Sequence, residues 1–222
     1  MEHFAEEAVK LRRRCERERN ARLAAEAIAE KGLRDLYEKQ QQLQLLEAIA
    51  VAANQSASVN EALQFALTAV CQSTGWPVGH AHLVLPAEGR KWLRSTGVWH
   101  GRDTEHMRPF FSATETTDFE PGTGLPGRVL ASAGPAWIAD IAKDCNFPRA
   151  QSAQLSGIRA SFAFPVLAGN DVAAVLEFFA QNVIAPDELL LRVMSQIGTQ
   201  LGRVFERKRA ENELIHDHCC PN

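Results

Sequence analysis

The first 54 residues contain no proline and one glycine, Gly32, so this segment is strongly biased toward helix. Its seam positions recur in alternating steps of four and three, which is the heptad repeat of a coiled coil. One frame fits the whole segment, with the seam at Phe4, Ala8, Leu11, Cys15, Glu18, Arg22, Ala25, Ala29, Gly32, Leu36, Lys39, Leu43, Leu46, Ala50 and Ala53. A sustained repeat of this period predicts a left-handed coiled coil, most simply a parallel homodimer.

The middle of this seam is weak. It holds the polar residues Glu18 and Arg22, and then three small residues, Ala25, Ala29 and Gly32. Such a stretch buries little apolar surface, so a dimer packed through it should be only marginally stable and able to shift. The alternative is a single amphipathic helix that folds back on its own domain, although most non-seam positions are Arg, Glu or Gln.

Beyond residue 55 the composition changes to that of a globular domain, and all ten prolines lie there. A helix is expected at residues 58–74, with Ser58 and Glu61 forming a capping box and Gly75 ending it. The remaining expected elements are strands at 79–85 and 91–99, a helix at 125–132, a strand at 135–138, a helix at 147–156, strands at 158–167 and 172–180, and a helix from 186. Residues 103–117 show no clean periodicity.

Both strand pairs are separated by turn-forming residues, which predicts two antiparallel hairpins. The strand at 172–180 is apolar almost throughout and is therefore expected at the centre of the sheet, covered on both faces. Antiparallel hairpins with helices collected to one side predict an α+β fold. The expected organisation is a coiled-coil helix at 1–42, a globular domain at 43–205 and an exiting linker helix at 206–222.

The overall charge and apolar pattern exclude several classes of function. A net charge of −3 provides no basic excess for binding nucleic acid. No apolar run approaches the roughly 20 residues of a membrane span, and the N-terminus lacks the layout of a signal peptide. The five cysteines show no paired spacing. We therefore expect a cytoplasmic protein with reduced thiols, and with neither a nucleic-acid partner nor a membrane span in this chain.

A glycine-rich stretch, PGTGLPGRV at residues 121–129, precedes and opens the short helix expected at 125–132. A phosphate-binding Walker loop needs Gly-Lys-Ser/Thr after its glycines, and this stretch has Gly-Arg-Val. Together with WIADI at 137–141 and IRASFAFPV at 158–166, it resembles the GAF domain family in order and spacing. The resemblance extends over residues 43–204 and implies a GAF-type antiparallel sheet in a non-enzymatic, small-molecule-sensing module.

The flanking helices resemble those of bacterial signalling proteins. Residues 17–37 look like the helices that precede sensor modules, and residues 207–217 look like the linker into a GGDEF diguanylate cyclase domain. Linkers into histidine kinases are similar, so the resemblance favours the cyclase without excluding the kinase. It implies a homodimer through the N- and C-terminal helices, with the catalytic output domain outside this chain.

By resemblance, a ligand would lie between the sheet and residues 103–128 and 137–157. The candidate ligand-binding residues are Trp137, Asp140, Phe147, Arg149 and Ser161. Trp137 and Phe147 equally suit the core, and Asp140 equally suits a cap of the following turn. Neither the ligand nor any cofactor can be named, and no catalytic or metal-binding residue is assigned.

Other chemistries have weaker support. His80 and His82 share one face of a strand, but the sequence offers no matching set of further metal ligands, so a surface or pocket-lining pair is expected. No Cys-His dipeptide of bilin-binding relatives is present, nor is the cyclic-nucleotide signature of other GAF domains. Two alternatives stay open: a ligand-free dimerisation spacer, and a methionine sulfoxide reductase using Cys145, for which Cys71 would be a buried second thiol.

Overall fold

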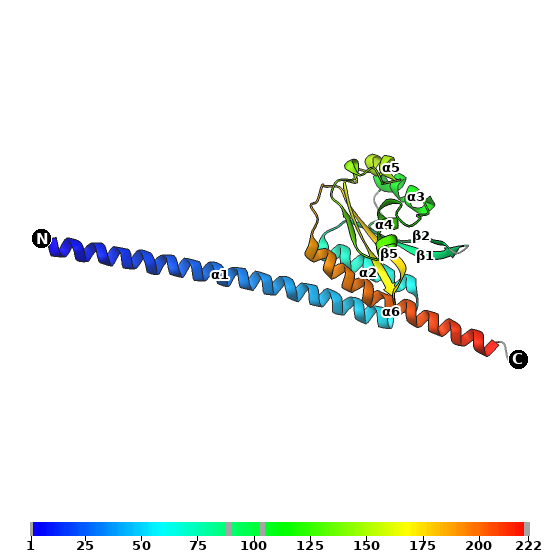
Figure 1. The fold of residues 1–222 in the computed structure, drawn as a ribbon, viewed down its shortest axis with the longest axis horizontal. Helices are drawn as coiled ribbons and strands as arrows, with labels where there is room; N and C mark the ends of the chain where they lie inside the picture. The colour runs from blue at the N-terminus through cyan, green and yellow to red at the C-terminus, as the bar shows by residue number, and fades with distance from the viewer. Residues whose placement is uncertain (1, 88–89, 103–104, 220–222) are drawn as a thin grey trace. The chain divides into compact units, whose positions relative to one another are not determined.

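The computed structural model describes residues 2–87, 90–102 and 105–219 (Figure 1). Contacts within the chain divide it into two units, residues 1–43 and 44–222. The elements are α1 (Glu2–Gln55), α2 (Val59–Thr74), β1 (Val78–Ala87), β2 (Arg90–His100), η1 (Glu105–Met107), α3 (Arg108–Thr116), α4 (Gly124–Ser132), β3 (Ala136–Ile138), η2 (Ile141–Lys143), α5 (Ala150–Leu155), β4 (Ala160–Ala168), β5 (Asp171–Ala180) and α6 (Glu188–Cys219). None of the described helices is long and apolar enough to cross a membrane.

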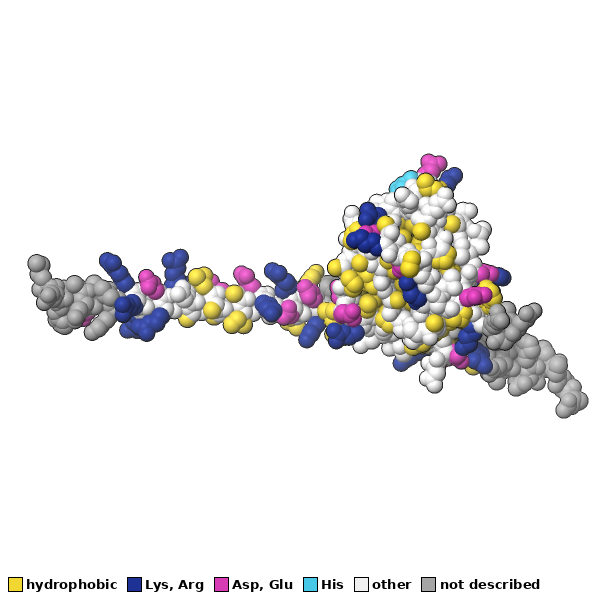
Figure 2. All heavy atoms as spheres, turned by 45° about the horizontal axis from the view of Figure 1, so that its top comes forward, with side chains coloured by type: hydrophobic (Ala, Val, Ile, Leu, Met, Phe, Trp, Pro, Cys, Tyr) yellow, Lys and Arg dark blue, Asp and Glu magenta, His cyan; other side chains and the backbone are white. Residues whose placement is uncertain are grey.

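The first unit is the N-terminal part of α1, as the proline-free sequence predicts. Figure 2 shows basic and acidic side chains interspersed along it, with ion pairs one turn apart such as Arg14 to Glu18 at 2.9 Å. The seam residues Leu36 and Leu43 are 64% and 66% exposed. The earlier seam positions Phe4, Ala8, Leu11 and Cys15 lie outside the residues whose side chains are described.

The last turns of α1 belong to the second unit and pack on its own core. Ile49 and Ala53 are buried there, and Leu46 is partly buried against the same cluster. Because Ala53 is only 1% exposed, it cannot also face a second chain. A single heptad frame through residue 53 is therefore wrong at its C-terminal end, where the chain uses these positions for its own domain.

The sheet has five antiparallel strands in the order β2-β1-β5-β4-β3, which confirms the predicted α+β class and both hairpins. β5 pairs with β1 on one side and β4 on the other, and it is buried along most of its length. The expectation of a central strand covered on both faces is therefore confirmed. The β4–β5 turn places Gly169 at φ 60°, a conformation that favours glycine.

Each face of the sheet has its own core and its own helices, so the helices are not collected to one side as the sequence predicted (Figure 1). The long helices α2 and α6, with the end of α1, cover one face, here called the α6 face. The short helices α3, α4 and α5 cover the other, here called the α3 face. Successive residues of β5 alternate between them, with Leu176 and Phe178 in the α6-face core and Val175 and Phe179 in the α3-face core.

Helix α6 lies directly on the backbone of β4. A Cβ atom added to Gly198 would overlap the carbonyl oxygen of Pro165, and one added to Gly202 would overlap that of Leu167. Because these neighbours are backbone atoms of a sheet, they cannot move aside as a flexible side chain would. The two glycines thus set how closely the exiting helix approaches the sheet.

The predicted helix caps are present, with one difference. The Ser58 hydroxyl accepts a hydrogen bond from the Glu61 amide at 3.2 Å, and Gly75 ends α2 in the left-handed conformation. The Glu61 carboxylate accepts from the Ala57 amide at 2.8 Å, one residue before the position that a capping box predicts. At α6, the Asp187 carboxylate accepts from two first-turn amides, so the helix begins at Glu188, two residues after the predicted start.

Helix α3 occupies most of the segment in which no periodicity was found. Its sequence, RPFFSATET, is rich in Ser and Thr, which have poor helix propensity. Its helical signals are Pro109 in the first turn and an inward face formed by Phe110, Phe111 and Thr114. Tertiary packing of this face therefore stabilises a helix that propensity alone does not predict.

Candidate ligand-binding site

Three ionisable side chains of the sheet are completely buried on the α3 face. His80 and His82 lie on β1, and Glu177 lies on β5 directly opposite His80 in the strand register. Burying ionisable groups costs free energy unless they are paired and hydrogen-bonded. The partners of these three groups therefore decide whether this is only core or also a site.

Arg149 supplies the counter-charge. It precedes α5, is only 3% exposed, and donates from Nη2 to Glu177 Oε1 at 2.6 Å and from Nη1 to Thr114 Oγ1 at 2.9 Å. The second carboxylate oxygen, Oε2, lies 3.3 Å from His82 Nε2. We call Arg149, Glu177, His80, His82 and Thr114 the polar cluster. It links β1 and β5 of the sheet to α3 and to the start of α5.

The protonation states follow from this arrangement. Burial raises the pKa of Glu177, but Arg149 and the hydrogen bond from His82 together lower it by more. The net shift is therefore downward, and the carboxylate stays ionised. Burial lowers the pKa of His82, partly offset by Glu177. Burial and the neighbouring His82 lower the pKa of His80 well below its usual value. Both imidazoles are therefore neutral near pH 7, and the pair of Arg149 and Glu177 balances in charge.

Each neutral imidazole leaves one ring nitrogen without a partner. His80 Nδ1 lies 2.8 Å from the Val98 carbonyl, which assigns the proton to Nδ1 and a lone pair to Nε2. His82 donates from Nε2 to Glu177, which leaves a lone pair on Nδ1. Four buried side-chain atoms among the described residues have no hydrogen-bond partner: His80 Nε2, His82 Nδ1, Arg149 Nε and Ser156 Oγ. Each such atom costs about 1–3 kcal/mol when nothing binds it.

Aromatic rings enclose the charged part of the cluster. The guanidinium carbon of Arg149 lies 4.9–5.6 Å from the ring centroids of Phe110, Phe119, Phe147 and Phe179. These distances are within the range of cation–π attraction. On the other side of the cluster, the Trp99 ring stacks on His80 with centroids 3.9 Å apart. The site therefore combines a charged pair with an apolar, aromatic wall.

A cleft of about 330 Å³ between α3 and α5 reaches this cluster. Its lining includes Ala113 from α3 and Thr117 just after it, Gln151 and Leu155 from α5, and Arg149 itself. Arg149 is thus a member of the buried cluster and also one of the residues that line the cleft.

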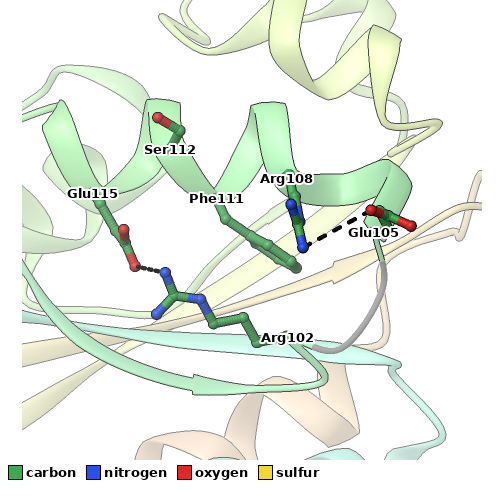
Figure 3. A pocket seen from close by; sticks show the side chains of 6 residues that line it. All are labelled: Arg102, Glu105, Arg108, Phe111, Ser112 and Glu115. Carbon is green, nitrogen blue, oxygen red and sulfur yellow. Dashed lines mark ion pairs between the residues drawn. The ribbon is translucent and has the colours of Figure 1, made fainter.

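A larger cleft of about 700 Å³ lies along the outer side of α3 (Figure 3). In it Arg102 points toward Glu115, at 2.9 Å, and Arg108 toward Glu105, at 3.9 Å. Both of its arginines are more than half exposed and already paired with glutamates, so neither is a buried charge that needs a ligand as its partner. Glu115 also accepts a hydrogen bond from Trp99 Nε1 at 3.0 Å, which ties this surface to the wall of the buried cluster.

The family model described as "GAF domain" matches residues 56–206, which is more than half of the chain. The chain belongs to the GAF domain family. The polar cluster and both hairpins lie within the matched residues, whereas the whole of α1 precedes them.

Solved GAF-fold structures resemble this one at low sequence identity. The nlh2 GAF domain of A. aeolicus in an inactive state is 19% identical with a TM-score of 0.59, covering 77% of this chain and 99% of that one. The free methionine-R-sulfoxide reductase of Neisseria meningitidis, in complex with its substrate, is 15% identical with a TM-score of 0.61, covering 77% and 91%. At these identities the likeness concerns the fold alone.

Among sequence relatives, the rice transcription factor MYC2 (Oryza sativa subsp. japonica) is 36% identical over 75 residues. The match covers 34% of this chain and 10% of that protein. This chain therefore spans only about a tenth of the relative's length, and the relative's function as a whole carries no direct statement about this GAF domain.

Within the GAF domain, the five predicted site residues do not form one group. Phe147 and Arg149 lie together at the polar cluster. Ser161 is buried and donates from its hydroxyl to the Phe178 carbonyl at 2.8 Å. Trp137 packs on the opposite α6 face against Phe162 and donates from Nε1 to the Ile184 carbonyl at 2.9 Å, so it is not part of the cluster.

Asp140 takes the capping role that was considered as its alternative. Its carboxylate accepts from the Ala142 amide at 3.3 Å and pairs with Arg159 at 3.1 Å. Burial raises its pKa, but the Arg159 hydrogen bond and this cap outweigh burial, so the net shift is downward. Asp140 therefore has local structural partners and is not drawn into the polar cluster.

Sequence reasoning missed Glu177, and with it the centre of the site. Glu177 is the one acid inside the otherwise apolar strand DVAAVLEFFA after its first residue. A charged residue in a central strand is buried almost only when it is paired, which is the signal that was available. His80 and His82 were expected at a surface or pocket wall, but they are fully buried. No group of three or more His, Cys, Asp or Glu among the described residues could hold a metal ion.

Proposed function

We propose that this GAF domain senses a small molecule at the polar cluster and passes the signal, in a homodimer, to a catalytic domain outside this chain. GAF domains are generally regulatory modules that sense small molecules. The observation that carries the proposal for this chain is the set of buried polar atoms without partners in and around the polar cluster, whose Arg149 also lines the cleft between α3 and α5. A purely structural core would be expected to satisfy them.

A continuous packed path leads from the cluster to the exiting helix. Glu177 lies on β5 between Leu176 and Phe178, whose side chains pack in the α6-face core. β5 pairs with β4, and α6 lies on the β4 backbone at Gly198 and Gly202. A ligand that displaces β5 or its partner Arg149 would therefore act on α6 through contacts that leave little free space.

The proposed homodimer uses the helices that flank the domain. Val51 and Phe65 are 46% and 42% exposed and line an apolar groove of about 440 Å³ on the end of α1 and on α2. Leu36 and Leu43, in the N-terminal unit, are also exposed. Large apolar side chains grouped on helical surfaces are typical of protein interfaces, and a second copy would bury them.

The output we propose is a diguanylate cyclase domain, with a histidine kinase as the second choice. Both rest on the resemblance of residues 207–217 to linkers of such proteins, and α6 extends through this segment as far as Cys219. A cytoplasmic location is part of the proposal, since the described cysteines Cys71 and Cys145 form no disulfide.

The competing enzymatic function is weaker for a chemical reason. A thiol reductase needs an accessible thiolate. Cys71 is buried on the α6 face, and burial raises the pKa of its thiol to about 12, so it stays protonated. Cys145 is exposed in the loop before α5, with no second thiol placed to assist it among the described residues. We therefore favour a regulatory role over a cysteine-based enzyme.

Crosslinking tests the dimeric relay. In a background with Cys15, Cys145, Cys219 and Cys220 replaced by Ser, L36C should form interchain disulfides quickly. The matched control E38C, almost opposite on the same helix, should react slowly. Ligand binding should alter the L36C rate. A monomeric mass by light scattering, with or without added small molecules, would remove the relay.

A further inference from the structure

Among the atoms of the polar cluster that have no hydrogen-bond partner, acceptors outnumber donors by two to one. Its acceptors are the two oxygens of Glu177 and the lone pairs on His80 Nε2 and His82 Nδ1, and neither of these nitrogens has a partner. Arg149 binds Thr114 through Nη1 and Glu177 through Nη2, and its Nε is the one donor of the cluster without a partner. The surroundings therefore suit a group rich in N–H donors.

Arg149 is itself such a group, and it fills an aromatic enclosure. Four phenylalanine rings lie within 5.6 Å of its guanidinium carbon, and Glu177 is its counter-ion. A carboxylate surrounded by aromatic faces is the arrangement by which proteins recognise organic cations. In this structure the chain's own arginine occupies that position.

The position of Arg149 also allows it to leave. It stands at the start of α5, a helix of six residues, and it lines the cleft between α3 and α5 that opens to solvent. Rotation of its side chain into that cleft would vacate the enclosure without breaking a strand of the sheet. The vacated space is bordered by Glu177, Thr114 and the phenylalanine rings.

We infer that the ligand of this site is a small organic cation with several N–H donors, such as a guanidinium, an amidinium or a primary amine, which competes with Arg149 for Glu177. This inference rests on the proposed sensor function and names its ligand class. Arg149 then acts as a built-in competitor that holds the site closed until the ligand replaces it.

Charge balance supports a cation over an anion or a neutral molecule. When Arg149 leaves, Glu177 is a buried carboxylate without a counter-charge, and breaking such a pair is strongly unfavourable. A second cation restores neutrality, whereas an anion would add repulsion. A quaternary ammonium would match the aromatic rings but would leave Glu177 Oε1 and both imidazole acceptors without hydrogen bonds.

Methylguanidinium and its uncharged isostere methylurea test the inference at millimolar concentration. Thermal melts and calorimetric titrations would compare the wild type, R149A and the double variant R149A/E177Q. The surface variant R159A, which breaks only the exposed pair with Asp140, is the matched control. We expect methylguanidinium to raise the Tm of R149A and methylurea to leave it unchanged.

The wild type should bind methylguanidinium at least about tenfold more weakly than R149A, because Arg149 occupies the site for most of the time. R159A should behave as the wild type, and R149A/E177Q should lose the response. Equal shifts with methylurea would overturn the inference. The inference would also be overturned if the Tm of the wild type did not rise with methylguanidinium at roughly 100 times the Kd measured for R149A. Arg149 would then not be displaced from Glu177 by a cation.

If R149A does not fold, R149K keeps a buried cation with a shorter reach, and methylguanidinium should compete with it more effectively than with the wild type. A neutral or anionic compound that stabilises the wild type, and loses this effect in T114V, would overturn the cation inference and leave the sensor proposal standing. A protein that no compound stabilises and that is monomeric would remove the sensor proposal itself.

Discussion

Replacing Glu177 with Gln tests whether the buried pair at the centre of the GAF domain is as the geometry indicates. Both partners are almost completely buried, with side-chain exposures of 1% for Arg149 and 0% for Glu177. E177Q keeps the shape of the side chain but leaves the guanidinium without a counter-charge. Breaking a buried pair in this way costs about 3–5 kcal/mol.

For a domain of this size each kcal/mol corresponds to a few degrees, so the Tm of E177Q should fall by about 6–20 °C. D171N is the matched control, because Asp171 begins the same strand and pairs with Lys91 while both side chains are more than half exposed. Exposed pairs contribute little to stability, so D171N should melt as the wild type does.

The assay is a thermal melt followed by circular dichroism at pH 7, with urea unfolding as an independent measure. The pKa of Glu177 is lowered in the folded state, so its contribution is present above the unfolded pKa and is lost as the pH falls through the folded value. The gap between E177Q and the wild type should therefore narrow in acid. If E177Q and D171N had the same Tm at pH 7, the buried ion pair between Arg149 and Glu177 would be refuted.

Three further predictions concern other parts of the chain. G202A should lose about 1–3 kcal/mol in urea unfolding, because its Cβ would meet the Leu167 carbonyl; G32A, with open space around it, should lose nothing, and equal stability of the two would contradict the close packing of α6 on β4. The pKa of His80 is lowered by burial, so stability should decline as the pH falls below about 6.5, the unfolded pKa of histidine. H80Q should reduce the fall of the Tm between pH 7 and pH 5. If that fall is unchanged in H80Q, groups other than His80 cause it. F65E should weaken the dimer at least about tenfold by light scattering, because a buried Phe contributes about 1.5–3 kcal/mol. L155E, which changes another exposed apolar residue on α5, should not weaken it; equal effects would remove Phe65 from the interface.

The sheet could be predicted because its signals are local. Turn residues flank each hairpin, and the apolar strand Asp171–Ala180 could only be central. Helix α3 could not, because its Ser- and Thr-rich sequence forms a helix through the packing of Phe110 and Phe111 on the α3 face. The local pattern reports propensity, and this helix depends on tertiary contacts.

The candidate site was predicted only in part because sequence does not say which face a strand residue takes. Trp137 and Ile138 are neighbours in β3, yet Trp137 packs on the α6 face and Ile138 on the α3 face. A shift of one residue exchanges the two faces, so proximity in sequence to Arg149 gave no guarantee that Trp137 would join it. Likewise the heptad pattern at Ala53 did not distinguish a second chain from the domain's own core.

The alternation along β5 has a consequence for how sensors of this type diversify. Residues 175, 177 and 179 face the cluster, while 174, 176 and 178 support the long helices. The residues of β5 that contact the ligand site and those that contact the long helices therefore alternate along one strand of ten residues. Substitutions at residues 175, 177 and 179 can therefore change which compound is bound, while the packing of the strand against the long helices is kept.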